Sequence, residues 1–127
     1  MRKIEAQMID AFLSCRDWHN SNTEVRFFNG LGSIFLHGHL ILEQTENSIN
    51  ISLCGWNTVT TRSRLNAILS VITEGRVAFN EKRIWERFRV CQRNFLPCLL
   101  VNDEVQEISS TDTIELQLEY GVEHQAA

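Results

Sequence analysis

The stretch from Cys54 to Leu69 constrains the fold most, because it combines a tight turn with the start of a helix. Cys54-Gly55 is typical of a turn, since glycine adopts unusual backbone angles at little cost. Beyond it, a helix is predicted over roughly 61–74. Its apolar residues recur at helical spacing on one face: Leu65, Ile68, Leu69 and Ile72.

Arg62 and Arg64 occupy the first turn of this predicted helix. The start of a helix exposes unpaired N–H groups and a partial positive charge, so arginine is electrostatically unfavourable there. A bound anion would offset that cost, because backbone N–H groups and guanidinium groups both bind phosphate. The alternative is that the two arginines bridge to Glu115 or Glu119 on the acidic final strand.

Length and composition are those of one globular domain, residues 1–127, with 43% hydrophobic and 22% charged residues. No apolar run reaches transmembrane length, and the first residues lack the apolar block of a signal peptide. We therefore expect a cytoplasmic protein that does not enter membranes. The four cysteines include no Cys-x-x-Cys pair, so we expect reduced thiols that serve as apolar fillers.

Charge is unevenly distributed along the chain. The net charge of -4 argues against nucleic-acid binding, which needs a basic surface. Residues 62–93 nevertheless hold eight basic and three acidic residues, whereas residues 102–127 hold seven acidic residues and no Lys or Arg. The basic segment coincides with the expected anion site, and most of its cations are arginines, which grip phosphate in bidentate geometry.

Alternation of apolar and polar residues predicts antiparallel strands around this helix. Asn29-Gly30 predicts a hairpin, and Gly38 predicts a bulge or bend. An amphipathic helix is predicted over 2–16, and Trp18 is expected to pack on the core. The fold class is therefore α+β, an antiparallel β-meander with two packed α-helices. The clearest strands cover residues 23–28, 33–42, 49–53, 96–101 and 113–120.

A further hairpin is predicted from residues 76–80 and 83–90. Its second strand places Trp85 on the same face as three arginines. Such a face suits a planar ring that carries phosphates, or else a solvated basic surface whose arginine stems cover the indole. The sequence leaves these two interpretations equal.

His37 and His39 are two residues apart, so both imidazoles would share one face of a strand. A metal site needs three or four ligands, and no third ligand is evident, so neither a metal nor a cofactor is expected. No nucleophile elbow, Walker loop or dinucleotide fingerprint is present, and nothing in the spacing pairs Cys54 with a histidine. The chain is therefore predicted not to be an enzyme.

Three segments, taken in order, resemble a family of short phage proteins. They are Lys3-Ile4-Glu5 in the first helix, Phe35-Leu36-His37-Gly38-His39 in the meander, and Gly55-Trp56-Asn57-Thr58 followed by Thr60-Thr61-Arg62-Ser63-Arg64-Leu65-Asn66-Ala67. Over roughly residues 3–90 this pattern is similar to that of the phage Thoeris anti-defence family, first type.

The resemblance implies a sponge that is not an enzyme. Members of that family bind cyclic ADP-ribose isomers made by bacterial immune proteins and hold them intact in the cytoplasm of the infected host. They form homodimers or higher oligomers, and some bind cyclic dinucleotides at a separate site. These properties are expectations for this chain that rest on the resemblance alone.

A cyclic ADP-ribose isomer needs an anion clamp for its pyrophosphate and a stacking ring for its adenine. We expect arginines and the backbone at the helix start to hold the pyrophosphate, an aromatic ring to stack on adenine, and an asparagine to bond the ribose. The residues expected in these roles are Thr60, Thr61, Arg62, Arg64, Phe79 or Trp85, and Asn80 or Asn94.

Two other functions remain open at this stage. The chain could inhibit a host protein by binding it through the acidic C-terminal region. It could also be a small nucleotide phosphodiesterase that uses the face carrying His37 and His39. Retention of an intact nucleotide separates the sponge from both.

Overall fold

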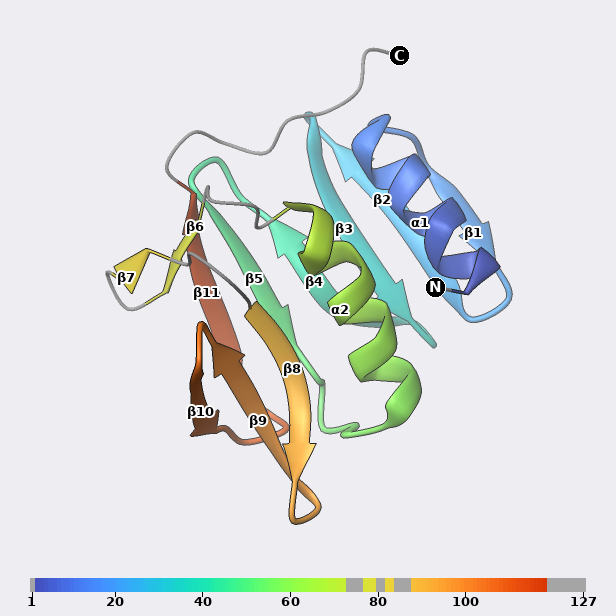
Figure 1. The fold of residues 1–127 in the computed structure, drawn as a ribbon. Helices are drawn as coiled ribbons and strands as arrows, with labels where there is room; N and C mark the ends of the chain where they lie inside the picture. The colour runs from blue at the N-terminus through green and yellow to red at the C-terminus, as the bar shows by residue number, and fades with distance from the viewer. Residues whose placement is uncertain (1, 73–76, 80–81, 84–87, 119–127) are drawn as a thin grey trace.

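The computed structural model describes residues 2–72, 77–79, 82–83 and 88–118. The predicted α+β class of two helices with antiparallel strands is confirmed in these residues (Figure 1). The strands form two sheets. No helix in this part of the chain is both long and apolar enough to cross a membrane. The elements in chain order are α1 (Lys3–Leu13), β1 (Trp18–Asn20), β2 (Thr23–Phe28), β3 (Leu31–Leu36), β4 (His39–Gln44), β5 (Ser48–Ser52), α2 (Val59–Ile72), β6 (Val77–Phe79), β7 (Lys82–Arg83), β8 (Phe88–Arg93), β9 (Leu96–Val101), β10 (Glu104–Glu107) and β11 (Thr113–Leu118).

The larger sheet begins as a meander, because β1 to β5 follow one another through short turns. Asn29-Gly30 joins β2 to β3 and His37-Gly38 joins β3 to β4. All four turn residues have positive φ, as a two-residue type I′ hairpin requires. The segment 33–42 is therefore two strands separated by a turn. β11 then returns beside β5, and β6 and β7 extend the sheet beyond it.

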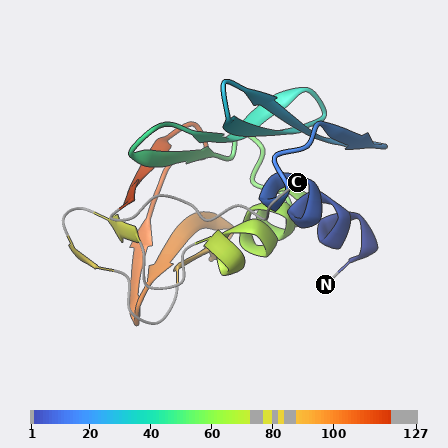
Figure 2. The same ribbon diagram turned by 90° about the horizontal axis from the view of Figure 1, so that it is seen from above.

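Both helices cover the same face of the meander (Figures 1 and 2). α1 contributes Met8 and Phe12 to the core, and the predicted stripe of α2 is buried in full. Each such apolar side chain contributes about 1.5–3 kcal/mol when it leaves water. The strand residues they meet include Val25, Ile34, Ile41, Ile49 and Ile51.

The smaller sheet, β10-β9-β8, is attached to the helical layer through α2. Asn66 donates a hydrogen bond to the carbonyl oxygen of Val90 at 2.8 Å and accepts one from the Val90 N–H at 2.7 Å. A side-chain amide thus occupies the place of a neighbouring strand at the outer edge of β8. This pairing satisfies backbone groups that an edge strand would otherwise leave open.

The strand predictions were wrong in three places. The polar segment Trp18–Asn20 forms β1, and β10 exposes all four of its residues, so neither strand has a buried face that alternation could mark. The two ends of the predicted strand 83–90 pair in different sheets, because β7 pairs with β6 whereas β8 pairs with β9, and residues 84–87 between them lie outside the described residues. Trp18 does pack on the core, as expected.

Candidate functional site

α2 begins two residues earlier than predicted, because Thr58 caps it. The N–H of Thr61 donates to Thr58 Oγ1 at 3.1 Å, and the two hydroxyl oxygens lie 2.9 Å apart. The N–H of Arg62 already donates to the Thr58 carbonyl oxygen at 3.1 Å, as a helix interior requires. The prediction that Arg62 and Arg64 share the first turn with unpaired N–H groups is therefore corrected.

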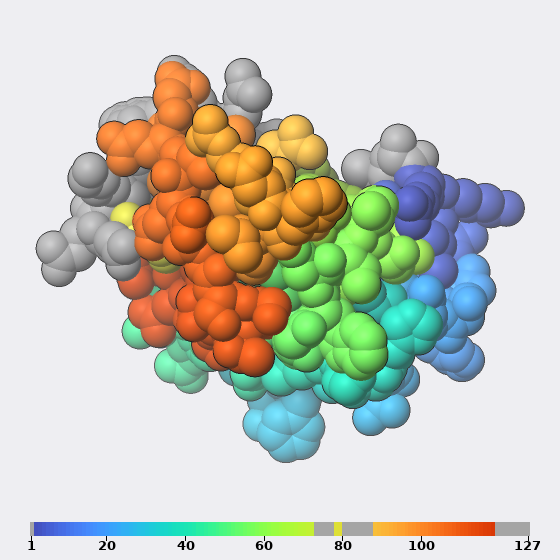
Figure 3. All heavy atoms as spheres, turned by 90° about the horizontal axis from the view of Figure 1, so that it is seen from below, coloured from blue at the N-terminus to red at the C-terminus, as the bar shows by residue number. Residues whose placement is uncertain are grey.

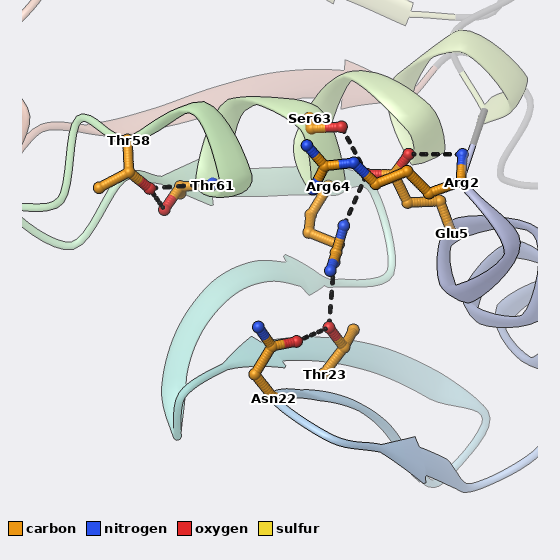
Figure 4. Close-up of polar contacts among 8 residues, drawn as sticks. All are labelled: Arg2, Glu5, Asn22, Thr23, Thr58, Thr61, Ser63 and Arg64. Carbon is orange, nitrogen blue, oxygen red and sulfur yellow. Dashed lines mark hydrogen bonds and ion pairs between the residues drawn. The ribbon is translucent and has the colours of Figure 1, made fainter.

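Arg64 points into the protein rather than toward a ligand site (Figure 4). Its Nη1 lies 2.8 Å from Glu5 Oε2, and its Nε donates to Thr23 Oγ1 at 3.0 Å. The hydroxyl of Ser63 donates to the same Glu5 oxygen. The side chains of Arg64 and Glu5 are only 5% and 3% exposed. The anion that offsets this arginine is thus Glu5 of α1, not the acidic final strand, on which Glu115 is exposed.

The carboxylate of Glu5 is held in its charged form. Burial raises the pKa of Glu5, but hydrogen bonds from Ser63 and Arg64, aided by the N–H of Arg2, outweigh burial and leave that pKa below 4.5. The pair is therefore ionised at neutral pH and ties α1, α2 and β2 together.

Arg62 is half-buried and braces the loop before the helix. Its Nη1 donates to the Asn57 carbonyl oxygen at 3.2 Å and to Gln92 Oε1 at 3.1 Å. Asn57 Nδ2 also donates to Gln92 Oε1, at 3.2 Å, so the loop is held against β8. Arg62 and the exposed Arg89 line a groove of about 760 Å³ between α2 and β8.

Two further residues expected at a site, Phe79 and Asn94, are described, and neither lines this groove. Phe79 is half-buried and its ring packs on Phe88, with centroids 5.9 Å apart. Asn94 is exposed in the turn between β8 and β9. Asn80 and Trp85 lie outside the described residues, so the expected adenine platform and its alternative, a solvated basic face, stay predictions.

Thr60 and Thr61 do line a cavity, of about 480 Å³, between the β3–β4 turn and the start of α2. Seen from below in Figure 3, the green start of α2 lies between the cyan meander and the orange β8–β9 hairpin. Buried Leu36, Ile41 and Leu53 supply apolar wall. The polar and aromatic lining comes from His37, His39, Trp56, Thr58, Thr60 and Thr61.

Trp56 is an exposed part of this cavity wall, with 56% of its surface open to solvent. Its ring centroid lies 6.1 Å from that of His39, and the two rings are tilted by 39°. His37 occupies the turn, with φ +50°, so the expectation that both imidazoles share a strand face was wrong. Among the described residues, no three His, Cys, Asp or Glu side chains lie close enough together to hold a metal ion.

The lining can bind a flat, negatively charged molecule. Indole and imidazole rings stack on planar rings. The partial positive charge at the start of α2, with the hydroxyl of Thr60, favours an oxyanion. No described residue that lines the cavity carries a carboxylate, which would repel one. The volume is within the usual range for small-molecule sites, roughly 300–1,000 Å³.

Sequence reasoning passed over Trp56 as a site residue, although a signal was present. In the stretch 54–69 the apolar residues from Leu65 onward fill the core, Thr58 caps the helix, Arg64 pairs with Glu5 and Asn66 pairs with Val90. Trp56 has no such role, and a large aromatic placed just before a helix start is a candidate for ligand contact.

Comparison with known proteins gives one match. The family model described as Kyanoviridae Gp96 protein matches residues 1–115, which is most of the chain. No curated protein and no solved structure matches.

Proposed function

The chain belongs to the Kyanoviridae Gp96 protein family, a phage protein family, and on that premise we propose that it sequesters a small nucleotide signal. The ligand we propose is a cyclic ADP-ribose isomer, bound in the cavity at the start of α2 and held intact. The place of action is the cytoplasm of the infected bacterial host. Self-association into a homodimer or higher oligomer belongs to the same proposal, because the sequence resemblance implies it.

One observation carries the proposal: Trp56 lies half-exposed over a cavity that also contains a helix start. Adenine would stack on Trp56 and His39, whose centroids are 6.1 Å apart. The pyrophosphate would then meet the first-turn N–H groups and Thr60. The apolar wall would exclude water and strengthen both contacts.

The roles first expected of the arginines change in this proposal. Arg64 forms an ion pair with Glu5, so in this proposal it holds α2 in position and does not contact phosphate. Arg62 supports the loop that carries Trp56, through Asn57. A sponge must hold its ligand at roughly nanomolar affinity, about -12 kcal/mol, so the ring and anion contacts have to act together. The groove lined by Arg62 and Arg89 is the place we propose for a cyclic dinucleotide.

Retention rather than cleavage is supported by the chemistry of the lining. Cys54, the thiol nearest in sequence, donates its hydrogen to the Leu40 carbonyl oxygen at 2.9 Å. Threonine hydroxyls need a base to act as nucleophiles, and here Thr58 and Thr61 bond each other. The described lining residues therefore offer binding groups but no activated nucleophile.

The test is retention of an intact nucleotide. The protein is mixed with cyclic ADP-ribose isomers, freed of unbound ligand and heated, and the released molecule is identified by mass spectrometry. We expect intact nucleotide from the wild type, and none from Trp56→Ala or Thr60→Ala. Phe28→Ala is the matched control, since Phe28 is an exposed aromatic at the opposite end of β3 from His37.

Each other outcome has a distinct meaning. A chemically altered product would replace the sponge with an enzyme. Failure of the wild type to retain any nucleotide would reject both and favour inhibition of a host protein. Thermal stability gives a second readout, because a ligand at 100 times its dissociation constant adds about 2.7 kcal/mol. Trp56→Ala should lose that gain while its ligand-free stability stays close to wild type, since the ring is exposed.

A further inference from the structure

Two of the four cysteines face each other across the β8–β9 hairpin. In the register of this antiparallel pair, Cys91 lies directly opposite Cys98. Directly opposite residues point to the same face of the sheet, with Cβ atoms about 4.5–5.5 Å apart. A disulfide needs roughly 3.5–4.5 Å between Cβ atoms, so closure asks for a shift of about 1 Å.

The shift would be confined to a short hairpin. β8 and β9 are joined by only two residues, Asn94 and Phe95, so the opposed strands move as one short unit. The two thiols are near enough for Cys98 to raise the pKa of Cys91, and the Cys98 thiol donates its hydrogen to the Leu96 carbonyl oxygen at 3.4 Å. No disulfide is present, since all four cysteines are free.

The two sulfurs differ in access to solvent. Cys91 is half-buried and lines the groove between α2 and β8, whereas Cys98 is fully buried. A reagent from solution therefore reaches Cys91 first, and Cys98 is placed behind it as the second thiol. This division is the one that thiol–disulfide exchange requires of an attacking and a resolving cysteine.

We propose that Cys91 and Cys98 form a dithiol site that low-molecular-weight disulfides oxidise to a cross-strand disulfide. This inference does not depend on the proposed nucleotide ligand. The site takes a soluble disulfide, such as oxidised glutathione, as its reactant.

The reaction balances in two steps. The Cys91 thiolate attacks one sulfur of the soluble disulfide, forming a mixed disulfide and releasing one small thiolate. The Cys98 thiolate then attacks the Cys91 sulfur, forming the protein disulfide and releasing the second small thiolate. The two protons from the cysteines go to the two leaving thiolates, so the protein is oxidised by two electrons and the reagent is reduced by two.

The environment makes this site slow at neutral pH. Burial raises the pKa of Cys91, the neighbouring Cys98 raises it further, and Arg89 and Arg62 only partly oppose them. Because the thiolate is the reacting form, oxidation should accelerate as the pH rises toward that raised pKa.

Cys91 is linked to the loop of the proposed nucleotide cavity through Gln92, the next residue in the chain. Gln92 follows Cys91 and accepts hydrogen bonds from Asn57 and Arg62, which hold the loop carrying Trp56.

The experiment uses the folded full-length protein with oxidised glutathione at increasing pH, followed by mass spectrometry. We expect Cys91 and Cys98 together to lose two hydrogens and to carry no glutathione, whereas exposed Cys15 can take up a glutathione of its own. Trypsin cuts after Arg89 and Arg93, so Cys91 and Cys98 fall on separate peptides that only a disulfide can join. A reducing agent should separate them again.

Three variants make the result decisive. Cys98→Ser should stop at a stable glutathione adduct on Cys91, and Cys91→Ser should leave Cys98 unreacted because it is buried. Cys15→Ser is the matched control, since Cys15 is exposed and lies elsewhere, and it should oxidise like the wild type. A glutathione adduct that persists on wild-type Cys91, or a linked pair that includes Cys15 or Cys54, would overturn the proposal.

Discussion

Glu5 and Arg64 form a buried ion pair whose two charges come from different helices. Removing two charges from water costs several kcal/mol each, and their attraction repays that cost only when further hydrogen bonds satisfy them. Ser63 bonds the carboxylate and Thr23 bonds the guanidinium. The pair therefore specifies how α1, α2 and β2 pack together. Either charge without its partner would destabilise the folded protein.

Glu5→Gln should destabilise the protein strongly. The amide keeps the shape of the carboxylate but leaves the Arg64 charge buried without a counter-charge, which costs about 3–5 kcal/mol. Urea unfolding of variant and wild type measures the difference. Asp10→Asn is the matched control, because Asp10 and Arg16 form an exposed pair, and its loss should cost about 0–1 kcal/mol. Equal effects of the two variants would contradict the structural role of Arg64.

Low pH should reduce the difference in unfolding free energy between the wild type and Glu5→Gln. The folded protein holds the pKa of Glu5 below 4.5, so this carboxylate stabilises the fold above the pKa of the unfolded chain. The contribution is lost as the pH falls through the folded pKa, and Glu5→Gln cannot lose it. The stability curves of wild type and variant should therefore converge below about pH 4.5. A gap that stays constant down to pH 3 would argue against an ionised Glu5.

At the scale of the elements, two-residue turns shape the strands. Asn29-Gly30, His37-Gly38 and Cys54-Gly55 each place glycine second, where φ is between +77° and +82°. Asn94-Phe95 has the same pair of positive φ values, +52° and +63°, but puts a phenylalanine second. Left-handed backbone costs an ordinary residue about 1–2 kcal/mol, so this turn is strained.

Phe95→Gly should stabilise the hairpin. Glycine removes the left-handed strain but adds disorder to the unfolded chain, so the expected net gain is about 0.5–1 kcal/mol. Little packing is lost, because Phe95 is 87% exposed. Denaturant unfolding gives the value, and Phe95→Ala, which removes the ring but keeps the Cβ strain, should change little. A loss of stability in both variants would show that the ring makes a contact of its own, and a loss in Phe95→Gly alone would show that the left-handed backbone at residue 95 is not strained.

At the scale of the whole molecule, sequence periodicity predicted the elements that have one buried face. α1, β2, α2 and β11 match the predicted segments, because their apolar residues recur at the right spacing. β1 and β10 were not predicted, since they are polar edge strands. The division into two sheets was also not predicted, because it depends on which strands pair, and pattern alone does not specify partners.

The candidate site was only partly predictable for the same reason. The helix start, with Thr60 and Thr61, could be located from local sequence. That Arg64 pairs with Glu5, 59 residues away, could not, because no local pattern joins them. The approach of His39 to Trp56 likewise depends on the return of the meander beside the loop before α2.

Asn66 attaches β8 of the smaller sheet to α2 through two hydrogen bonds to Val90. We therefore expect the smaller sheet to open without the larger one when these bonds are lost. Asn66→Ala removes both and leaves the Val90 N–H and carbonyl unpaired, at a cost of about 1–3 kcal/mol. Local opening is governed by local contacts, so amide hydrogen exchange should rise roughly tenfold or more in β8 and β9. Exchange in β2, β3 and β4 should stay near the wild-type rate.

Ser70→Ala is the matched control for that experiment. Ser70 lines the same groove on the same helix, but its hydroxyl donates to the carbonyl oxygen of Ala67 within α2, at 2.7 Å, and to no described residue of β8. Its loss should leave exchange in β8 unchanged. If Asn66→Ala instead accelerates exchange equally in every strand, the two sheets open as one unit. The amide of Asn66 would then stabilise the whole fold rather than the attachment of one sheet to it.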